Sequence, residues 1–314
     1  GEDFLRVMVQ AATQTHDVSP HACSRSLHEA AILLQHDGYA ALPTWSSIVQ
    51  GLSPPQIDAL SQEPGEPRKG WQAHATTVRN THKFVNFMNR LSSGDRARLR
   101  SCAGPNTGRW LSAIPSEKQL ELECNIFRCA IFRRLGLPVS TDADNCEGCG
   151  RVLDPCGWHR TTCMRTGRVQ LRHKPLIKIW TRIFREAGIS IPHRDIERLM
   201  HRTHIRRGPN DMRRMDITTA GIDGVYGGSP LFMDVTIISP IHGTGLPMSR
   251  SADHDGAAND RAESRNRDTD YPDIEASPHA QLLSLGVETY GRWSKHCLTL
   301  MRHLAKYKSR QVPV

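Results

Sequence analysis

A β-hairpin is predicted by residues 216–238, which read DITTAGIDGVYGGSPLFMDVTII. Residues 217–222 and 231–238 are rich in β-branched and other apolar side chains, as strands buried in a sheet usually are. Between them, Asp223-Gly224 and Gly227-Gly228 are typical turn pairs, because glycine accepts the positive φ angles that tight turns need. We therefore expect a sheet that contains this hairpin.

An aspartate occupies a matching place on each strand of the hairpin. Asp216 precedes the first strand and Asp234 lies inside the second. If the chain turns around Val225, the two residues are cross-strand partners or nearly so, and their carboxylates lie close together. Two neighbouring carboxylates can hold Mg2+, an ion that polarises a phosphodiester and activates water. The alternative is a structural carboxylate at a strand end, whose burial is compensated by hydrogen bonds.

A group of cysteine and histidine residues has the spacing of a zinc knuckle. Cys146 and Cys149 form a Cys-x2-Cys pair, and His159 and Cys163 follow. Thiolate and imidazole donors suit tetrahedral Zn2+, and four protein ligands make a structural site rather than a catalytic one. The chain has 9 cysteines, an odd number that disfavours a complete disulfide framework. Cys156 is a spare ligand, and free thiols in an irregular loop are the alternative to a metal site.

The positive charge of the chain is concentrated in one block. The net charge is +9, yet residues 160–216 alone hold fifteen basic and five acidic residues, a net of +10. Such a block suits binding to a phosphate backbone, whereas a well-solvated basic surface is the alternative. His173, which lies within this block, is a candidate for packing or for supporting the carboxylates as well. The candidate nucleic-acid contacts are Arg172, His173, Lys178, Arg182, Arg185, Arg206, Arg207, Arg213 and Arg214.

Helical patterns lie on both sides of the hairpin. Residues 175–187 repeat apolar side chains at helical spacing, start at Pro175 and are followed by Gly188, which predicts a helix with a proline start and a glycine stop. Residues 282–308 also have a helical pattern, whereas the polar residues 249–277 predict a surface loop. The fold class predicted from these elements is α+β.

The chain divides into four segments by composition. Residues 1–70 predict a helical segment with a linker, residues 71–140 a second helical region, residues 141–170 the knuckle, and residues 171–314 the domain that contains the hairpin. No apolar run approaches the ~20 residues that span a bilayer, so we expect no membrane insertion. Because the first residue is Gly1 rather than Met, we expect the chain to be a piece of a longer polypeptide.

Several short motifs follow one another in a characteristic order. They are Gly108-Arg109-Trp110-Leu111, Arg133-Arg134-Leu135-Gly136-Leu137-Pro138, the knuckle, Arg172-His173, Arg214-Met215-Asp216-Ile217, Asp234-Val235-Thr236 and Val287-Glu288-Thr289-Tyr290-Gly291. Over roughly residues 105–300 this order resembles the C-terminal part of non-long-terminal-repeat retrotransposon polyproteins. In that family a reverse transcriptase is followed by a zinc knuckle and a restriction-like endonuclease.

The resemblance implies a restriction-endonuclease-like α/β core of the PD-(D/E)xK type in residues 171–314. The family's Arg/Lys-Pro-Asp motif maps onto Arg214-Met215-Asp216, and its second acid maps onto Asp234. The implied activity is that of a Mg2+-dependent endonuclease, a hydrolase that nicks target DNA so that the free 3′ hydroxyl primes reverse transcription. The resemblance then implies DNA as the main partner, the element's RNA as a second one, and a nuclear location. It also implies a reverse transcriptase upstream. Residues 71–140 resemble the thumb and connecting region of that reverse transcriptase.

The chain departs from the family pattern at two positions. Met215 replaces the proline of the first motif, and Thr236 stands where a lysine is expected two residues after Asp234. Relatives take this cation from a helix that precedes a tyrosine, which makes Arg267, ahead of Tyr271, the candidate catalytic cation. Arginine supplies charge but is a poor proton donor or base.

Two other functions stay open on the sequence alone. The first is a catalytically decayed zinc-knuckle module that binds nucleic acid without cutting it. The second is a zinc-stabilised interaction protein that meets no nucleic acid. Salt-sensitive binding separates the first from the second, because contacts to phosphates release counterions.

Overall fold

The computed structural model describes residues 71–116, 118, 121–140, 144–191, 205 and 213–311, together with Ile32, Gln35 and His36. Apart from these three residues, the helical segment and linker predicted in 1–70 lie outside the described residues. The chain forms two compact units, Gly1–Leu91 and Ser92–Val314. The boundary falls inside the region 71–140, so the helices after it belong to the same unit as the knuckle and the sheet.

The helices predicted in 71–140 are present. Helix α4 (Trp71–Arg90) belongs to the first unit, and α5 (Ser93–Cys102) and α6 (Cys124–Leu135) belong to the second. The Ser92 side chain caps α5 by accepting a hydrogen bond from the Asp95 backbone N–H. Short helical segments also occur, among them η1 (Arg109–Leu111), α7 (Trp158–Thr162), η3 (Met164–Thr166) and η4 (Tyr226–Gly228).

A small mixed sheet forms the centre of the second unit. Its strands are β1 (Ile217–Thr219), β2 (Leu231–Ile238) and β3 (Gln281–Glu288), in the order β1-β2-β3. β1 and β2 pair antiparallel, which confirms the predicted hairpin, and β2 and β3 pair parallel. The helical prediction was wrong for residues 281–288, because a short apolar run fits a buried strand as well as a helix.

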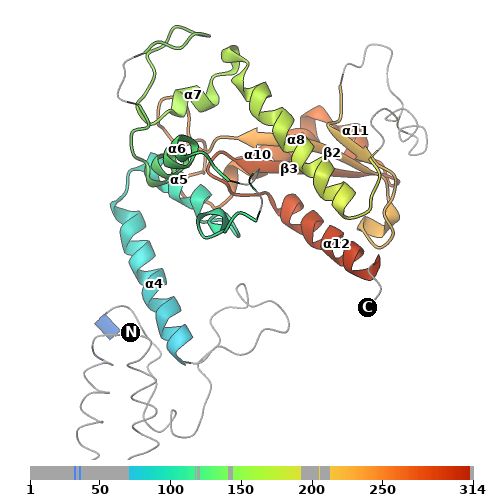
Figure 1. The fold of residues 1–314 in the computed structure, drawn as a ribbon, viewed down its shortest axis with the longest axis horizontal. Helices are drawn as coiled ribbons and strands as arrows, with labels where there is room; N and C mark the ends of the chain where they lie inside the picture. Colours follow the sequence, from blue (N-terminus) through green and yellow to red (C-terminus); the bar gives the residue numbers. More distant parts are fainter. Residues whose placement is uncertain are drawn as a thin grey trace, which may run out of the picture. The chain divides into compact units, whose positions relative to one another are not determined.

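The sheet is covered on both faces (Figure 1). Odd-numbered residues of β2, such as Met233 and Val235, pack into the main apolar cluster with Trp180 of α8 (Arg168–Glu186) and Leu300 of α12 (Lys295–Gln311). On the opposite face, Phe232 packs with residues of the 266–275 region. This alternation follows from the two-residue period of a strand, which sends successive side chains to opposite faces.

Helix α8 is longer than the sequence predicts. It begins at Arg168, after Gly167 with φ 65°, so Pro175 lies inside the helix rather than at its start. The predicted end is confirmed, because Gly188 has φ 80° and its backbone N–H bonds to the Arg185 carbonyl at 2.9 Å.

The surface loop predicted for 249–277 contains helices. These are α10 (Ala257–Arg265), the π-helical turn η5 (Asn266–Asp270) and α11 (Pro272–Glu275). The prediction failed because it looked for large apolar residues, whereas α10 packs against β3 through alanines that are fully or nearly fully buried. The described helices include none that is both long and apolar enough to cross a membrane.

Candidate functional site

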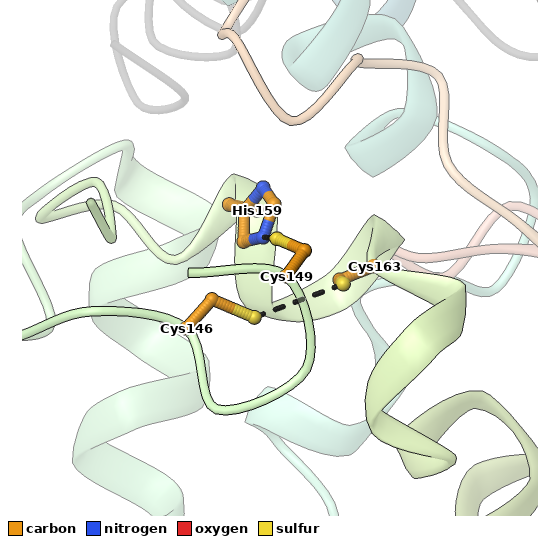
Figure 2. A group of neighbouring side chains, drawn as sticks. All are labelled: Cys146, Cys149, His159 and Cys163. Carbon is orange, nitrogen blue, oxygen red and sulfur yellow. Dashed lines mark hydrogen bonds between the residues drawn. The ribbon is translucent and has the colours of Figure 1, made fainter. Parts of the chain in front are cut away.

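Four ligand atoms converge in the predicted zinc knuckle. The side chains of Cys146, Cys149, His159 and Cys163 each offer one ligand atom, and these atoms all lie within 4.8 Å of one another. Figure 2 shows the four side chains gathered between the turn at 146–149 and α7. Cys146 Sγ lies 3.7 Å from Cys163 Sγ, and Cys149 Sγ lies 3.1 Å from His159 Nε2. The cluster can hold a metal ion and is compatible with structural zinc.

The backbone turn in 145–152 brings the first two thiols together. The Gly150 backbone N–H donates to the Cys146 carbonyl at 2.8 Å. Gly148 has no room for a side chain, because a Cβ would lie 2.9 Å from backbone atoms of residues 165–166. Hydrogen bonds, the strongest from the Gly148 backbone N–H, outweigh burial and lower the pKa of the Cys146 thiol to about 6, which favours the thiolate that a metal ion needs.

Helix α7 presents the histidine of the cluster. Its N-terminus is capped by Asp154, whose carboxylate accepts from the backbone N–H groups of Trp158 at 2.9 Å and His159 at 2.7 Å. The spare ligand Cys156 lies elsewhere, with its Sγ 4.0 Å from the Gly136 carbonyl oxygen. The structure therefore groups the four residues that the spacing predicts and leaves Cys156 out.

Asp216 and Asp234 lie at opposite positions of the antiparallel β1–β2 pair. The register pairs Ile217 with Met233, so one further step places Asp216 opposite Asp234. This geometry agrees with the cross-strand placement expected from the sequence, while the roles of the two residues stay a prediction.

His173 holds Asp216 at the end of β1. Asp216 Oδ2 accepts from the Val235 backbone N–H at 2.8 Å and lies 3.1 Å from His173 Nε2. The same Nε2 lies 2.7 Å from the Val235 carbonyl oxygen, and because a carbonyl only accepts, Nε2 carries a proton. Burial raises the pKa of the Asp216 carboxyl. The hydrogen bond from Val235 and the nearby His173 lower this pKa in part, whereas the charge of the neighbouring Asp234 raises it further. His173 thus supports a carboxylate, one of the roles that the sequence left open.

Asn266 fixes the second carboxylate. Asp234 Oδ2 accepts from Thr236 Oγ1 at 2.6 Å and from Asn266 Nδ2 at 2.8 Å. The same amide donates to Oγ of Ser284 at 3.0 Å, the residue that pairs with Asp234 in the β2–β3 register. The sequence analysis missed Asn266 because it lies in the segment assigned to a loop. The available signal was Asp234 itself, because a polar side chain inside an apolar strand needs a hydrogen-bonding partner.

One cleft is lined both by residues of the Cys3His group and by the two carboxylates. It has a volume of about 1350 Å3 and is lined at one end by Cys149, His159 and Cys163 and elsewhere by Asp216 and Asp234. Its walls come from residues 149–165, the start of α8, strand β2 with the loop after it, and the α10–η5 segment. Each of these elements belongs to the second compact unit.

Arginines from opposite parts of the unit line this cleft. Among them, Arg172 was predicted, and its guanidinium donates to the Thr161 carbonyl at 2.6 Å, so it also ties α8 to α7. Burial lowers the pKa of Arg172. The other arginines of the lining were not singled out from the sequence, because their common position depends on how distant segments fold together. The lining arginines are Arg151, Arg165, Arg172, Arg261 and Arg265.

The remaining predicted nucleic-acid contacts, His173 aside, are not brought together with the carboxylates. Arg213 lies 2.7 Å from Asp273, in an ion pair, and Arg214 is exposed. Three residues are exposed on α8 and do not line the cleft: Lys178, Arg182 and Arg185. Two lie outside the described residues: Arg206 and Arg207.

Arg267, the expected catalytic cation, does not line the cleft either. Its Nε lies 2.8 Å from the Asp268 carboxylate, and this pairing raises the pKa of Arg267. Proximity to Tyr271 in the sequence suggested the role, but the turn η5 directs this side chain to solvent. The cations that line the cleft near this point are Arg261 and Arg265 of α10.

Within the described part of the chain, the Cys3His group is the one set of three or more Cys, His, Asp or Glu residues with ligand atoms this close together. Asp216, Asp234 and His173 therefore do not form a comparable three-residue metal cluster. The chain matches no family model, no curated protein and no solved structure. Any assignment of function must start from the chemistry of the cleft.

Proposed function

We propose that the chain is the Mg2+-dependent DNA endonuclease region of a retroelement protein, which nicks target DNA. One observation carries the proposal: Asp216 and Asp234 lie on neighbouring strands in a cleft whose walls carry arginines. Carboxylates are the oxygen donors that Mg2+ prefers, and arginines bind phosphate oxygens. The cleft thus joins the two kinds of side chain that hydrolysis of a phosphodiester needs.

The two carboxylates fit the donor set of Mg2+. This ion is usually held by one or two carboxylates, with waters and substrate phosphates in the other positions. Asp216 and Asp234 each use Oδ2 for hydrogen bonds, and within the described residues no hydrogen bond reaches either Oδ1. When bound, Mg2+ would polarise the scissile phosphodiester and lower the pKa of a water.

Neighbouring side chains position the two carboxylates. His173 opposes the effect of burial and favours the ionised form of Asp216, while Thr236 and Asn266 orient Asp234. The arginines that line the cleft can contact phosphates and so position a strand over the carboxylates without reading bases. The nick would leave a free 3′ hydroxyl as the primer for reverse transcription.

The remaining segments support a retroelement origin through their order. The helices after Ser92, the Cys3His group and the hairpin follow one another as in the polyproteins that the sequence resembles. We propose structural zinc in the Cys3His group, a nuclear location, and a reverse transcriptase upstream as the partner that uses the nick. The PD-(D/E)xK fold is part of the same proposal.

A second function is favoured by one specific observation. No lysine lines the cleft among the residues that the structure describes, and Thr236, at the position expected for lysine, donates its hydroxyl to Asp234. A catalytically decayed module that binds DNA or RNA in the same cleft would have these features. Such a module binds with a marked salt dependence and leaves the strands intact.

Nicking of a supercoiled plasmid in Mg2+ separates the two functions. Asp216→Asn and Asp234→Asn should each lower the rate by about 100-fold or more, because each replaces a charged carboxylate ligand of Mg2+ with a neutral amide. The matched control is Asp260→Asn, an exposed residue of α10 outside the cleft lining, which should keep the wild-type rate. Salt-dependent binding without nicking would favour the decayed module, and wild-type rates in both cleft variants would refute the endonuclease.

A further inference from the structure

Helix α10 presents two arginines to the cleft and continues into Asn266. Arg261 and Arg265 are four residues apart, so they lie on one face of the helix. Asn266 contacts Asp234 Oδ2 at 2.8 Å, which fixes this end of α10 relative to the carboxylate. A rise of ~1.5 Å per residue puts the backbone of Arg261 ~7 Å along the axis from Asn266, within reach of an arginine side chain.

Arg261 has hydrogen-bonding capacity that the described residues do not fill. Its Nη1 donates to the Ser249 carbonyl, which anchors the guanidinium. Its Nη2 is buried and has no hydrogen-bond partner in the part of the chain that the structure describes. Burial lowers the pKa of Arg261, and the distant Glu288 opposes this effect. Arg261 also lines the cleft, so its guanidinium is placed to meet an anion bound there.

The neighbouring cations of the cleft and of η5 are already engaged. Arg265 Nε lies 3.1 Å from Asp270, and Arg267 Nε lies 2.8 Å from Asp268. In contrast, no carboxylate of the described residues lies within ion-pair distance of Arg261.

We infer that Arg261 binds a backbone phosphate of the nucleic acid in this cleft and supplies the cation that Thr236 does not. The inference rests on the proposed function and names the residue that holds the substrate's charge. Arginine stays protonated at all working pH values, so Arg261 stabilises negative charge on the phosphate and takes no part in proton transfer. Its planar guanidinium offers two parallel donors to one phosphate, which a lysine does not.

The test is the salt dependence of binding to a plasmid-derived duplex in Ca2+, with the full chain. Arg261→Gln keeps a donor for the Ser249 carbonyl but loses the charge, so the slope of log K against log salt should fall by about 1, as for one lost phosphate contact. Arg261→Lys should keep the slope. The matched control is Arg310→Ala, an exposed residue of α12 outside the cleft lining, which should also keep the slope.

Nicking in Mg2+ supplies the second measurement. Arg261→Gln should lower the rate by about 100-fold, and Arg261→Lys by less, at an unchanged melting temperature. An unchanged salt slope in Arg261→Gln would overturn the inference, whatever the nicking rate. A wild type that binds but never nicks would refute the endonuclease, and the slope would still decide whether Arg261 contacts a phosphate.

Discussion

His173 Nε2 lies 3.1 Å from Asp216 Oδ2, so a residue of helix α8 holds the carboxylate that directly precedes strand β1. Both side chains also bond to the backbone of Val235, one to its N–H and the other to its carbonyl. Strand β1 begins directly after this carboxylate, and the imidazole helps to set the protonation of the carboxylate.

Replacing His173 should shift the pH dependence of nicking. His173 favours the charged form of Asp216 and so lowers its pKa against the effect of burial. In His173→Ala the pKa of Asp216 should rise further, and the rising limb of the pH–rate profile should move to higher pH. The control is His254→Ala, an exposed residue, which should leave the profile in place. Identical profiles for His173→Ala and wild type would refute this role.

The buried carboxylate of Asp216 should lower the free energy of unfolding at neutral pH. Burial raises its pKa above that of the unfolded chain, so the folded state binds the proton more tightly. The stability that comes from this tighter proton binding is fully present below the usual aspartate pKa of about 4. It is lost as the pH rises through the pKa of Asp216 in the folded state. Asp216→Asn should therefore gain free energy of unfolding relative to wild type as the pH rises above the usual aspartate pKa of about 4. Urea unfolding at several pH values measures this, and a difference that does not change with pH would contradict it.

The Cys3His group should retain one zinc ion, and Cys156 should not contribute. Cys149→Ser removes one of four ligands, so the purified variant should lose its metal and be less stable by several kcal/mol. Cys156→Ser is the matched control, because its thiol lies outside the group, and it should keep both metal and stability. Elemental analysis and thermal unfolding measure the two effects. Equal metal loss in both variants would show that the ligands are assigned incorrectly.

The loop after β2 packs directly on the metal cluster. A Cβ on Gly243 would lie 3.1 Å from Nδ1 of His159 and 2.8 Å from Oγ1 of Thr162. Gly243→Ala should thus displace the histidine, cost about 1–3 kcal/mol and speed the release of zinc to a chelator. In Gly108→Ala the nearest atom would be a guanidinium nitrogen at 3.5 Å, an ordinary contact, so this control should behave as wild type. Equal zinc release from the two variants would show that the loop does not support the cluster.

Local patterns in the sequence were sufficient to predict part of the fold and of the site. The hairpin depends on apolar runs and turn residues within 216–238, and the register is set by the same stretch. The four ligands of the Cys3His group also lie within 18 consecutive residues, 146–163, where spacing alone restricts the geometry. The end of α8 at Gly188 followed from the need for a positive φ angle.

The rest depends on contacts between distant segments. Strand β3 pairs parallel with β2 across a long connection, so its partner cannot be read from the neighbouring sequence. Asn266 and Arg261 reach the cleft because α10 packs over that sheet, and no spacing rule relates them to Asp234. Arg267 was chosen for its distance in sequence from Tyr271, and the π-helical turn that directs it to solvent has no clear signal in the sequence.

The most direct test of a joint role for the two aspartates is plasmid nicking by the Asp216→Asn, Asp234→Asn double variant in Mg2+. If both carboxylates serve one metal centre, either single substitution should abolish the centre, so the double variant should nick no more slowly than the singles. All three should fall far below wild type. A double variant that nicks at the wild-type rate would contradict the proposal that this cleft cuts DNA.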